Sequence, residues 1–171
     1  MKPNNISTEV QEVIGELIFK LSSLSLDELN QRPETDAWSA AQVGEHLLKS
    51  YDTVKVLYGN TKETERQIDE KVETIKNLFL NFDRKFKNPD FITPSDGFID
   101  KETLVNDLEE SKNRLIEAAA TLDMNLTCTD FALPTIGEFT RLEWIKFMII
   151  HTQRHLHQLK NTIERVKAMA E

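Results

Sequence analysis

Apolar residues recur every three or four positions along most of the chain, a spacing typical of amphipathic helices rather than strands. The first stripe consists of Ile6, Val10, Val13, Leu17, Leu21 and Leu24. This spacing predicts a first helix that ends before Pro33. No stretch of the chain alternates between apolar and polar positions in the manner of a strand.

A second helix is predicted to begin at Ser39. Ser39 is followed three residues later by Gln42, which is the spacing of a capping box. The apolar stripe after it consists of Val43, Leu47, Tyr51, Val54 and Tyr58. Gly59-Asn60 is the expected end of this helix.

Three further helical patterns follow. The third stripe consists of Ile68, Val72, Ile75, Phe79, Phe82 and Phe86, and the proline-containing segment NPDFITPSDG then predicts a loop. A fourth helix is expected from Lys101 to about Leu122. The last helix is expected from Thr140, which forms a second capping box with Glu143, to roughly Lys167.

These patterns predict an all-α fold. The stripes are read as the faces that form the core, and the short connections between most of them favour an antiparallel bundle. No internal repeat, low-complexity tract or linker divides the chain, so a single domain spanning residues 1–171 is predicted.

Composition excludes several classes of function. The net charge of −8 argues against nucleic-acid binding, which requires a concentrated basic face. The longest purely apolar run is FMII, far short of the ~20 residues of a membrane span. The N-terminus does not resemble a signal peptide, so a soluble, cytoplasmic protein without a membrane partner is expected. Cys128 is the only cysteine, and it is read as a half-buried small residue.

The candidate chemistry lies in the stretch HTQRHLHQ near the end of the chain, which holds three of the four histidines. At about 100° per residue, His151 and His155 fall on one flank of the apolar stripe, whereas His157 faces away. Two imidazoles four residues apart on a helix can reach one cation. His46, the remaining histidine, lies at the edge of the apolar stripe of its own helix.

The spacing alone leaves two interpretations open. The inward pair can be half of a metal site, or its members can be hydrogen-bonded core residues. Other kinds of site are excluded more firmly, because the sequence contains no His-Glu-x-x-His, no Glu-x-x-His, no glycine-rich phosphate loop and no Gly-x-Ser-x-Gly.

Two stretches together resemble the DinB/YfiT-like superfamily of helical-bundle metalloproteins. They are AWSAAQVGEH at residues 37–46 and TRLEWIKFMIIHTQRHLHQL at residues 140–159. The features that match, in order, are Trp38-Ser39, His46, Glu143-Trp144, the His-x-x-x-His pair and Gln158. The resemblance extends to helix order and spacing across nearly the whole chain.

This resemblance implies a four-helix bundle of the up-down-down-up type, with an additional helix between its second and third helices. It also implies a divalent metal, zinc or nickel, bound by His46, His151 and His155. Several relatives are S-transferases that use a low-molecular-weight thiol, and others are regarded as metal-dependent hydrolases. A cation held by three neutral imidazoles keeps an open position and lowers the pKa of a bound thiol or water.

Neighbouring residues are given supporting roles. Gln158 is expected either to orient a metal ligand or a bound water by a hydrogen bond, without binding the metal itself, or to be an ordinary exposed polar residue. Arg154 is expected to pair with an acidic neighbour and to have no catalytic role. Trp38 and Trp144 are interpreted as packing anchors. His157 is interpreted as solvated, and as an alternative ligand only if the helix register shifts.

Two hypotheses of function follow. The first is a metal-dependent enzyme acting on a small molecule, with thiol S-transfer favoured over hydrolysis. The alternative is a non-enzymatic metal-binding or structural bundle, such as a stress or dimerisation protein. A homodimer formed through an apolar helix face is compatible with both hypotheses.

Overall fold

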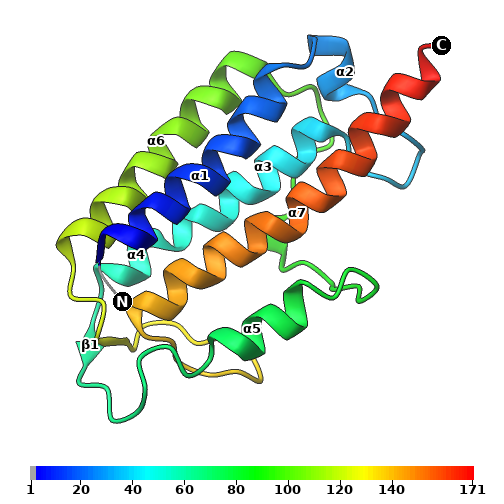
Figure 1. Ribbon diagram of the computed structural model, residues 1–171. Helices are drawn as coiled ribbons and strands as arrows, with labels where there is room; N and C mark the ends of the chain where they lie inside the picture. Colours follow the sequence, from blue (N-terminus) through cyan, green and yellow to red (C-terminus); the bar gives the residue numbers. More distant parts are fainter. Residues whose placement is uncertain (1–2) are drawn as a thin grey trace.

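The computed structural model describes residues 3–171, and helices dominate it (Figure 1). In chain order the elements are α1 (Pro3–Ser22), α2 (Leu26–Asn30), α3 (Ala40–Ser50), the 3-10 turn η1 (Tyr51–Thr53), α4 (Val54–Leu57), β1 (Thr61–Lys62), α5 (Val72–Phe79), the 3-10 turn η2 (Asp90–Ile92), α6 (Lys101–Thr121), β2 (Thr127–Cys128) and α7 (Arg141–Met169). The prediction of an all-α fold is confirmed, with one two-residue strand pair added to it.

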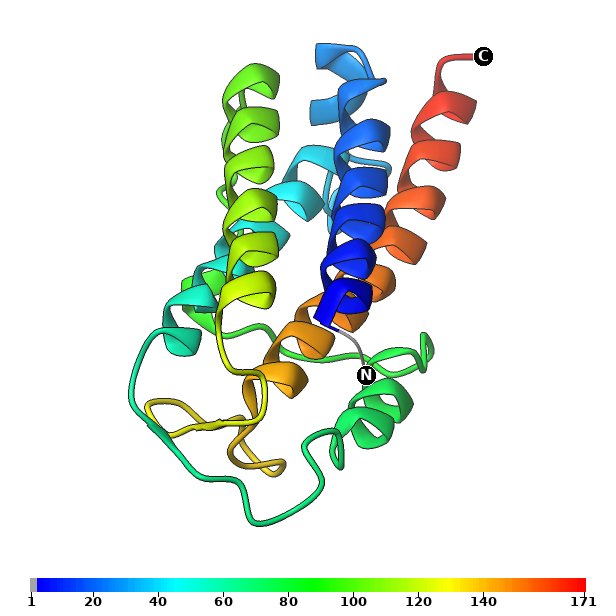
Figure 2. The same cartoon turned by 60° about the vertical axis from the view of Figure 1, so that its left-hand side comes forward.

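Four long helices pack side by side. Helix α1 contacts α3, α6 and α7, and α3 in turn contacts α6 and α7. In Figures 1 and 2, α1 and α7 run in one direction while α3 and α6 run in the other. Helix α5 lies outside this group, against α7. Within residues 3–171, no helix is long and apolar enough to cross a membrane.

Gly44 lies where α3 closely approaches both α1 and α6. A Cβ atom at Gly44 of α3 would lie 2.7 Å from Cδ1 of Leu21 on α1 and 3.1 Å from Cδ2 of Leu104 on α6. Both leucines are buried in the hydrophobic core. The missing side chain therefore allows α3 to pack deeply between α1 and α6.

The first predicted helix is in fact two. Helix α1 ends at Ser22, and α2 begins after Ser25, whose side chain forms a capping box with Glu28. Leu24, between the two helices, is buried all the same. The apolar spacing therefore continues across a point where the helix is interrupted, because the capping box at Ser25 starts a new helix there.

The second predicted helix is confirmed from its start to near its expected end. Ser39 accepts from the backbone N–H of Gln42, and the Gln42 side chain accepts from the backbone N–H of Ser39. The helix continues from α3 through η1 into α4, which ends at Leu57. The predicted capping box of Thr140 and Glu143 at the start of α7 is also present.

The third predicted helix is much shorter than its apolar pattern suggested, because only Val72–Phe79 is helical. The preceding backbone is held by α7, where the hydroxyl of Thr140 donates to the carbonyl of Ile68. After α5 the chain turns away, so Phe82 and Phe86 are exposed rather than packed in a core. Contacts with other segments therefore shorten this helix at both ends, although the apolar spacing continues beyond it.

Arg154 binds the end of α5, and within residues 3–171 no acidic side chain forms an ion pair with it, contrary to the expectation from the sequence. Its guanidinium donates to the carbonyl oxygens of Phe79 and Asn81, both at 3.0 Å, and to that of Arg84. The carbonyl of Phe79 is one that the last turn of a helix leaves without an intrahelical partner, whereas Asn81 and Arg84 lie beyond the helix. Arg154 therefore ties the end of α5 and the following turn to α7.

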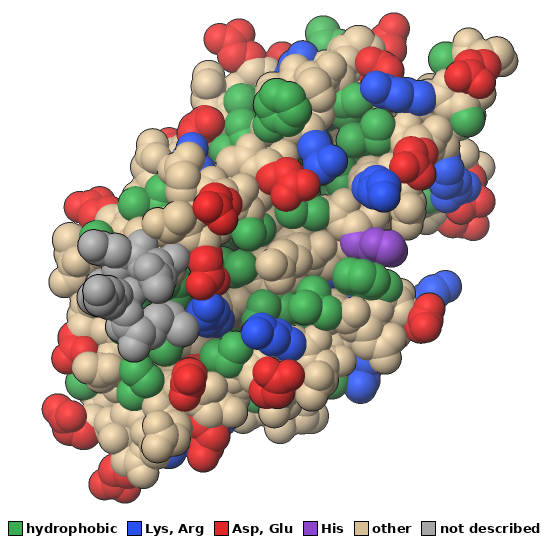
Figure 3. Space-filling view, in the orientation of Figure 1, with side chains coloured by type: hydrophobic (Ala, Val, Ile, Leu, Met, Phe, Trp, Pro, Cys, Tyr) green, Lys and Arg blue, Asp and Glu red, His purple; other side chains and the backbone are tan. Residues whose placement is uncertain are grey.

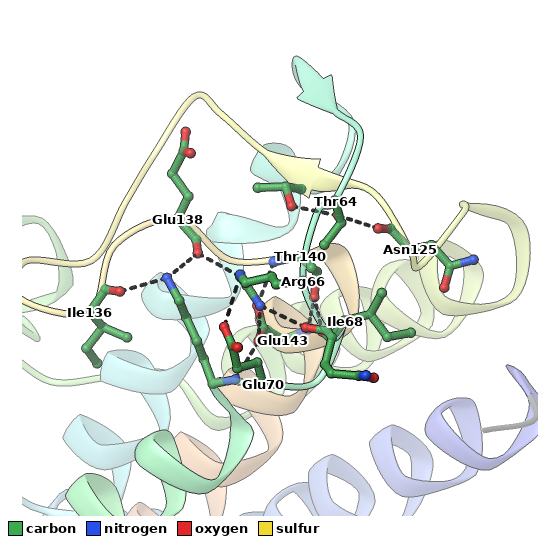
Figure 4. A network of polar contacts seen from close by, with 12 residues as sticks. Thr64, Arg66, Ile68, Glu70, Asn125, Ile136, Glu138, Thr140 and Glu143 are labelled. Carbon is green, nitrogen blue, oxygen red and sulfur yellow. Dashed lines mark hydrogen bonds and ion pairs between the residues drawn. The ribbon is translucent and has the colours of Figure 1, made fainter.

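A buried ion pair fixes the segment between β1 and α5 to the start of α7 (Figure 4). Arg66 donates to both oxygens of Glu143, at 2.9 and 2.7 Å, and the backbone N–H of Lys71 donates to the same carboxylate at 2.7 Å. Burial alone would raise the pKa of Glu143, but these bonds and that from the N–H of Thr140 outweigh it and lower the pKa.

Cys128 lies on β2, which pairs with β1 in a short antiparallel ladder. It is fully buried rather than half-buried, and burial raises the pKa of its thiol to about 11. Such a thiol stays protonated at neutral pH and does not act as a nucleophile. The prediction of a small residue with a packing role is consistent with this environment.

Replacing Arg66 with alanine should destabilise the fold strongly, since the Glu143 carboxylate would remain buried without its cation. We expect a loss of about 3 kcal/mol in the free energy of unfolding, measured by urea denaturation with circular dichroism. The matched control is Lys62→Ala, which removes an exposed ion pair with Glu138 and should cost less than about 1 kcal/mol. Equal losses in the free energy of unfolding of the two variants would contradict the conclusion that Arg66 compensates the buried charge of Glu143.

Candidate metal centre

Two helices that are distant in sequence bring three histidines together. His46 lies on α3, and His151 and His155 lie one turn apart on α7, which packs against α3. Their Nε2 atoms are 3.2 Å apart between His46 and His151, 3.0 Å between His46 and His155, and 3.1 Å between His151 and His155. The three residues that the resemblance implies as ligands therefore face one point.

The outer nitrogens of two of these rings are held by fixed acceptors. Nδ1 of His46 lies 2.8 Å from the carbonyl oxygen of Ile92, and Nδ1 of His155 lies 2.7 Å from Oε1 of Gln158. A carbonyl oxygen only accepts, so both Nδ1 atoms carry the proton and both Nε2 atoms present a lone pair inward. Gln158 thus contacts the histidine cluster directly instead of standing free on the surface.

His151 is held by packing instead. Its ring lies parallel to that of Phe147, with the centroids 5.6 Å apart, and meets the edge of Phe79 at 6.1 Å. Its Nδ1 is buried and has no hydrogen-bond partner among residues 3–171. If its proton sits on Nε2, it can be shared with only one neighbour, which leaves the lone pairs of His46 and His155 facing each other.

The surroundings keep all three rings neutral. Burial lowers the pKa of His151 well below its usual value, and repulsion from His155, His46 and Arg154 adds to this effect. Burial is also the main reason that the pKa of His155 falls to about 3. Burial lowers the pKa of His46 as well, against a hydrogen bond to Ile92 that favours protonation. Neutral imidazole is the form that binds metal ions.

The spacing of the three nitrogens fits a transition-metal ion. With metal–nitrogen bonds of about 2.0–2.1 Å, ligand angles between octahedral and tetrahedral values require nitrogen–nitrogen distances of about 2.9–3.4 Å. The observed distances of 3.0–3.2 Å lie inside this range. A cation at this point would also satisfy the facing lone pairs that no proton arrangement satisfies. The residues present therefore fit a metal, and within residues 3–171 they form the one cluster of this kind.

The segment that supplies the Ile92 carbonyl, residues 92–95, is held against one face of α3, and we call it the strap. Lys49 donates to the carbonyl of Thr93 at 2.7 Å, and Glu45 accepts from the backbone N–H and the hydroxyl of Ser95, both at 2.9 Å. Gln42 donates to the carbonyl of Ser95. Sequence reasoning missed this strap, although four polar residues of α3 (Gln42, Glu45, His46 and Lys49) share the helical spacing that makes one face.

Trp38 packs against the hydrophobic core, as the sequence suggested, and it also contacts the histidine cluster. It is only partly buried, and its ring centroid lies 5.1 Å from that of His46 and 6.5 Å from that of His155. Trp38 therefore borders the histidine cluster at His46 and His155, whereas Phe79 contacts His151. Trp144, in contrast, is fully buried against Phe139, as a packing anchor should be.

His157 lies outside the cluster. It is exposed, and its ring stacks on Phe82 with the centroids 3.9 Å apart. The helical wheel had assigned it to the solvent side, and this prediction is confirmed. The helix register leaves His151 and His155 as the two inward histidines of α7.

Comparison with known proteins agrees with this centre. The sequence profile of the DinB superfamily matches residues 10–159. The chain belongs to the DinB superfamily. The chain is also similar to the uncharacterized protein YuaE of Bacillus subtilis (strain 168), with 30% identity over 150 residues, which cover 86% of this chain and 91% of YuaE. No solved structure matches the chain. The resemblance drawn from the two sequence stretches is thus confirmed.

The metal-free protein should lose stability as the pH falls from 6.5 to 4.5. The three histidines have lowered pKa values in the folded state, so the unfolded chain binds more protons once the pH falls below about 6.5. The free energy of unfolding should then fall by about 1.4 kcal/mol per pH unit for each histidine that stays neutral when folded. Urea denaturation of chelator-treated protein at a series of pH values measures this slope.

The control for this experiment is His157→Ala, which removes an exposed histidine and should leave the slope unchanged. The upper half of the window, from pH 6.5 to about 5.5, lies above the range in which Glu143 contributes, since the carboxyl of the unfolded chain binds protons only near its ordinary pKa of 4.5. A stability that does not change between pH 6.5 and 4.5 would show that the three imidazoles are not held neutral.

Proposed function

We propose that this DinB-superfamily protein is a divalent-metal-dependent enzyme that acts on a small molecule, with thiol-dependent S-transfer favoured over hydrolysis. His46, His151 and His155 would bind the metal, zinc or nickel. The observation that carries the proposal is the convergence of three buried Nε2 atoms, two of them held in the ligating tautomer by Ile92 and Gln158. Histidines that bind metals almost always donate their other ring N–H to a fixed acceptor in this way.

The chain's own residues would prepare the centre. Three neutral imidazoles add no negative charge, so a bound cation would keep its full Lewis acidity and lower the pKa of a thiol or water. Gln158 would hold the ring of His155 in place, and the strap at Ile92 would do the same for His46. Trp38, Phe79 and Phe147 would limit the access of bulk water to the cluster.

The absence of an acidic group in the cluster supports thiol transfer over hydrolysis. Metal-dependent hydrolases commonly use a carboxylate near the metal to accept the proton of the attacking water. Within residues 3–171, the groups gathered at this point are the three histidines alone. A thiol has a much lower pKa than water and does not need such a base.

The proposal extends to the arrangement of the whole chain. The four long helices would form the up-down-down-up bundle expected from the resemblance, in one domain spanning residues 1–171, with α5 as an elaboration. The opposed directions of α1 and α3, and of α6 and α7, support this reading. A cytoplasmic protein without a nucleic-acid or membrane partner, forming a homodimer, is the context proposed for it.

Protein purified without a histidine tag should contain about one metal ion per chain, or take one up from Zn²⁺ or Ni²⁺ solution. His46→Ala, His151→Ala and His155→Ala should each weaken metal binding at least tenfold, because each removes one of three ligands. Isothermal titration calorimetry and elemental analysis measure this. His157→Ala is the matched control and should bind as the unmodified protein does. Unchanged binding in His46→Ala and His151→Ala would refute the site.

Activity is tested with a panel of cellular thiols and a chlorinated aromatic test electrophile, with zinc or nickel added to metal-free protein. We expect thioether formation with at least one thiol, its loss in His151→Ala, and its retention in His157→Ala. If metal binding is confirmed, no thiol reacts, and chelation lowers only the melting temperature, the non-enzymatic structural alternative is favoured instead.

A further inference from the structure

The histidine cluster contains no negative group. Among residues 3–171, the side chains gathered there are three histidines, which offer neutral nitrogen ligands. Arg154 lies between His151 and His155 in the sequence of α7. A divalent cation bound at the cluster would therefore add to the positive charge of Arg154, and no carboxylate belongs to the cluster to balance the two.

Arg154 also places a short segment beside the cluster. It is the residue before His155 on α7, and it binds the backbone carbonyls of Phe79, Asn81 and Arg84. Residues 81–88 follow α5, and Arg154 holds the first part of this stretch, from Asn81 to Arg84, against α7. This segment, which we call the basic segment, carries Arg84, Lys85 and Lys87 against the single acid Asp83.

A chain of aromatic rings connects the cluster with the basic segment. Phe79 meets the ring of His151, and Phe86 stacks on Phe79 with the centroids 5.0 Å apart. The guanidinium groups of Arg154 and Arg84 lie over the ring of Phe86, at 4.8 and 5.5 Å from its centroid. An apolar path therefore leads from a metal ligand to two positive charges.

This region can be reached from solvent. His46 is fully buried, but His151 and His155 keep 6% and 8% of their surface, and Phe86 is 39% exposed. On the face of the molecule drawn in Figure 3, Lys and Arg side chains lie beside hydrophobic side chains. A ligand approaching from the side of α7 would thus meet aromatic rings and guanidinium groups before the histidines.

We infer that the centre binds an anionic small molecule with an apolar body, whose negative group lies at Arg84 and Arg154 and whose body lies along Phe86 and Phe79. This inference rests on the proposed function and deepens it, because it names the charge and polarity of the substrate. The basic segment is then the element that selects the substrate, whereas the helices supply the metal ligands.

The test uses cobalt-loaded protein and three thiols of equal length that differ in charge: mercaptopropanesulfonate, mercaptopropanol and aminopropanethiol. The sulfonate group is a poor metal ligand, so tighter binding of this thiol cannot come from the sulfonate binding to the cobalt ion. Thiolate-to-cobalt absorption reports binding without any turnover. We expect the sulfonate to bind at least about fivefold more tightly than the alcohol, and the amine more weakly than both. The difference should shrink as salt is added.

Arg84→Gln is the decisive variant, since its side chain lies at the surface and the backbone carbonyl that Arg154 binds is retained. It should reduce the preference for the sulfonate to about twofold or less while cobalt binding is unchanged. Arg114→Gln, which removes an exposed arginine of α6, is the matched control and should keep the full preference.

The outcomes separate this inference from the proposed function. Equal affinities for the three thiols, or a preference that survives Arg84→Gln, would overturn the inference and leave the metal centre standing. Cobalt binding without a thiolate band for any thiol would overturn the inference together with the thiol-transfer proposal. Failure to bind cobalt would overturn the metal centre itself.

Discussion

Three imidazoles are buried between α3 and α7, and the surrounding residues hold them there although their lone pairs face each other. Lone pairs that face each other at 3.0–3.2 Å are unfavourable in a medium of low polarity, where no water can separate them. The structure nevertheless fixes this arrangement, through Ile92 and Gln158 on the outer nitrogens and Phe147 against the ring of His151. Such a cluster is satisfied by a cation and by little else.

The parts that sequence reasoning predicted well depend on residues within one or two helical turns. The capping boxes at Ser39 and Thr140, and the inward pair formed by His151 and His155, each follow from helical geometry alone. The wheel also separated His157 from that pair. His46 needed the family resemblance, since no local rule states which residue of α3 will face α7.

The parts that were missed depend on contacts between distant segments. Arg66 and Glu143 are 77 positions apart, and neither has a neighbour in sequence that predicts the other. The carbonyl of Ile92 carries no side-chain signal at all, although it fixes the tautomer of His46. Helical spacing from Ile68 to Phe86 was misleading for the same reason, since bonds from α7 decide where α5 begins and ends.

The long helices and the chain between α4 and α6 therefore have different roles at the histidine cluster. The metal ligands lie on long helices whose packing is set by a large core, so their geometry tolerates little change. The chain between α4 and α6 instead reaches the cluster through a few contacts, at Phe79 and Ile92, and carries Phe86 and Arg84 at its surface. Substitutions there can change what approaches the centre without moving a ligand, which is where binding specificity is commonly placed on a rigid scaffold.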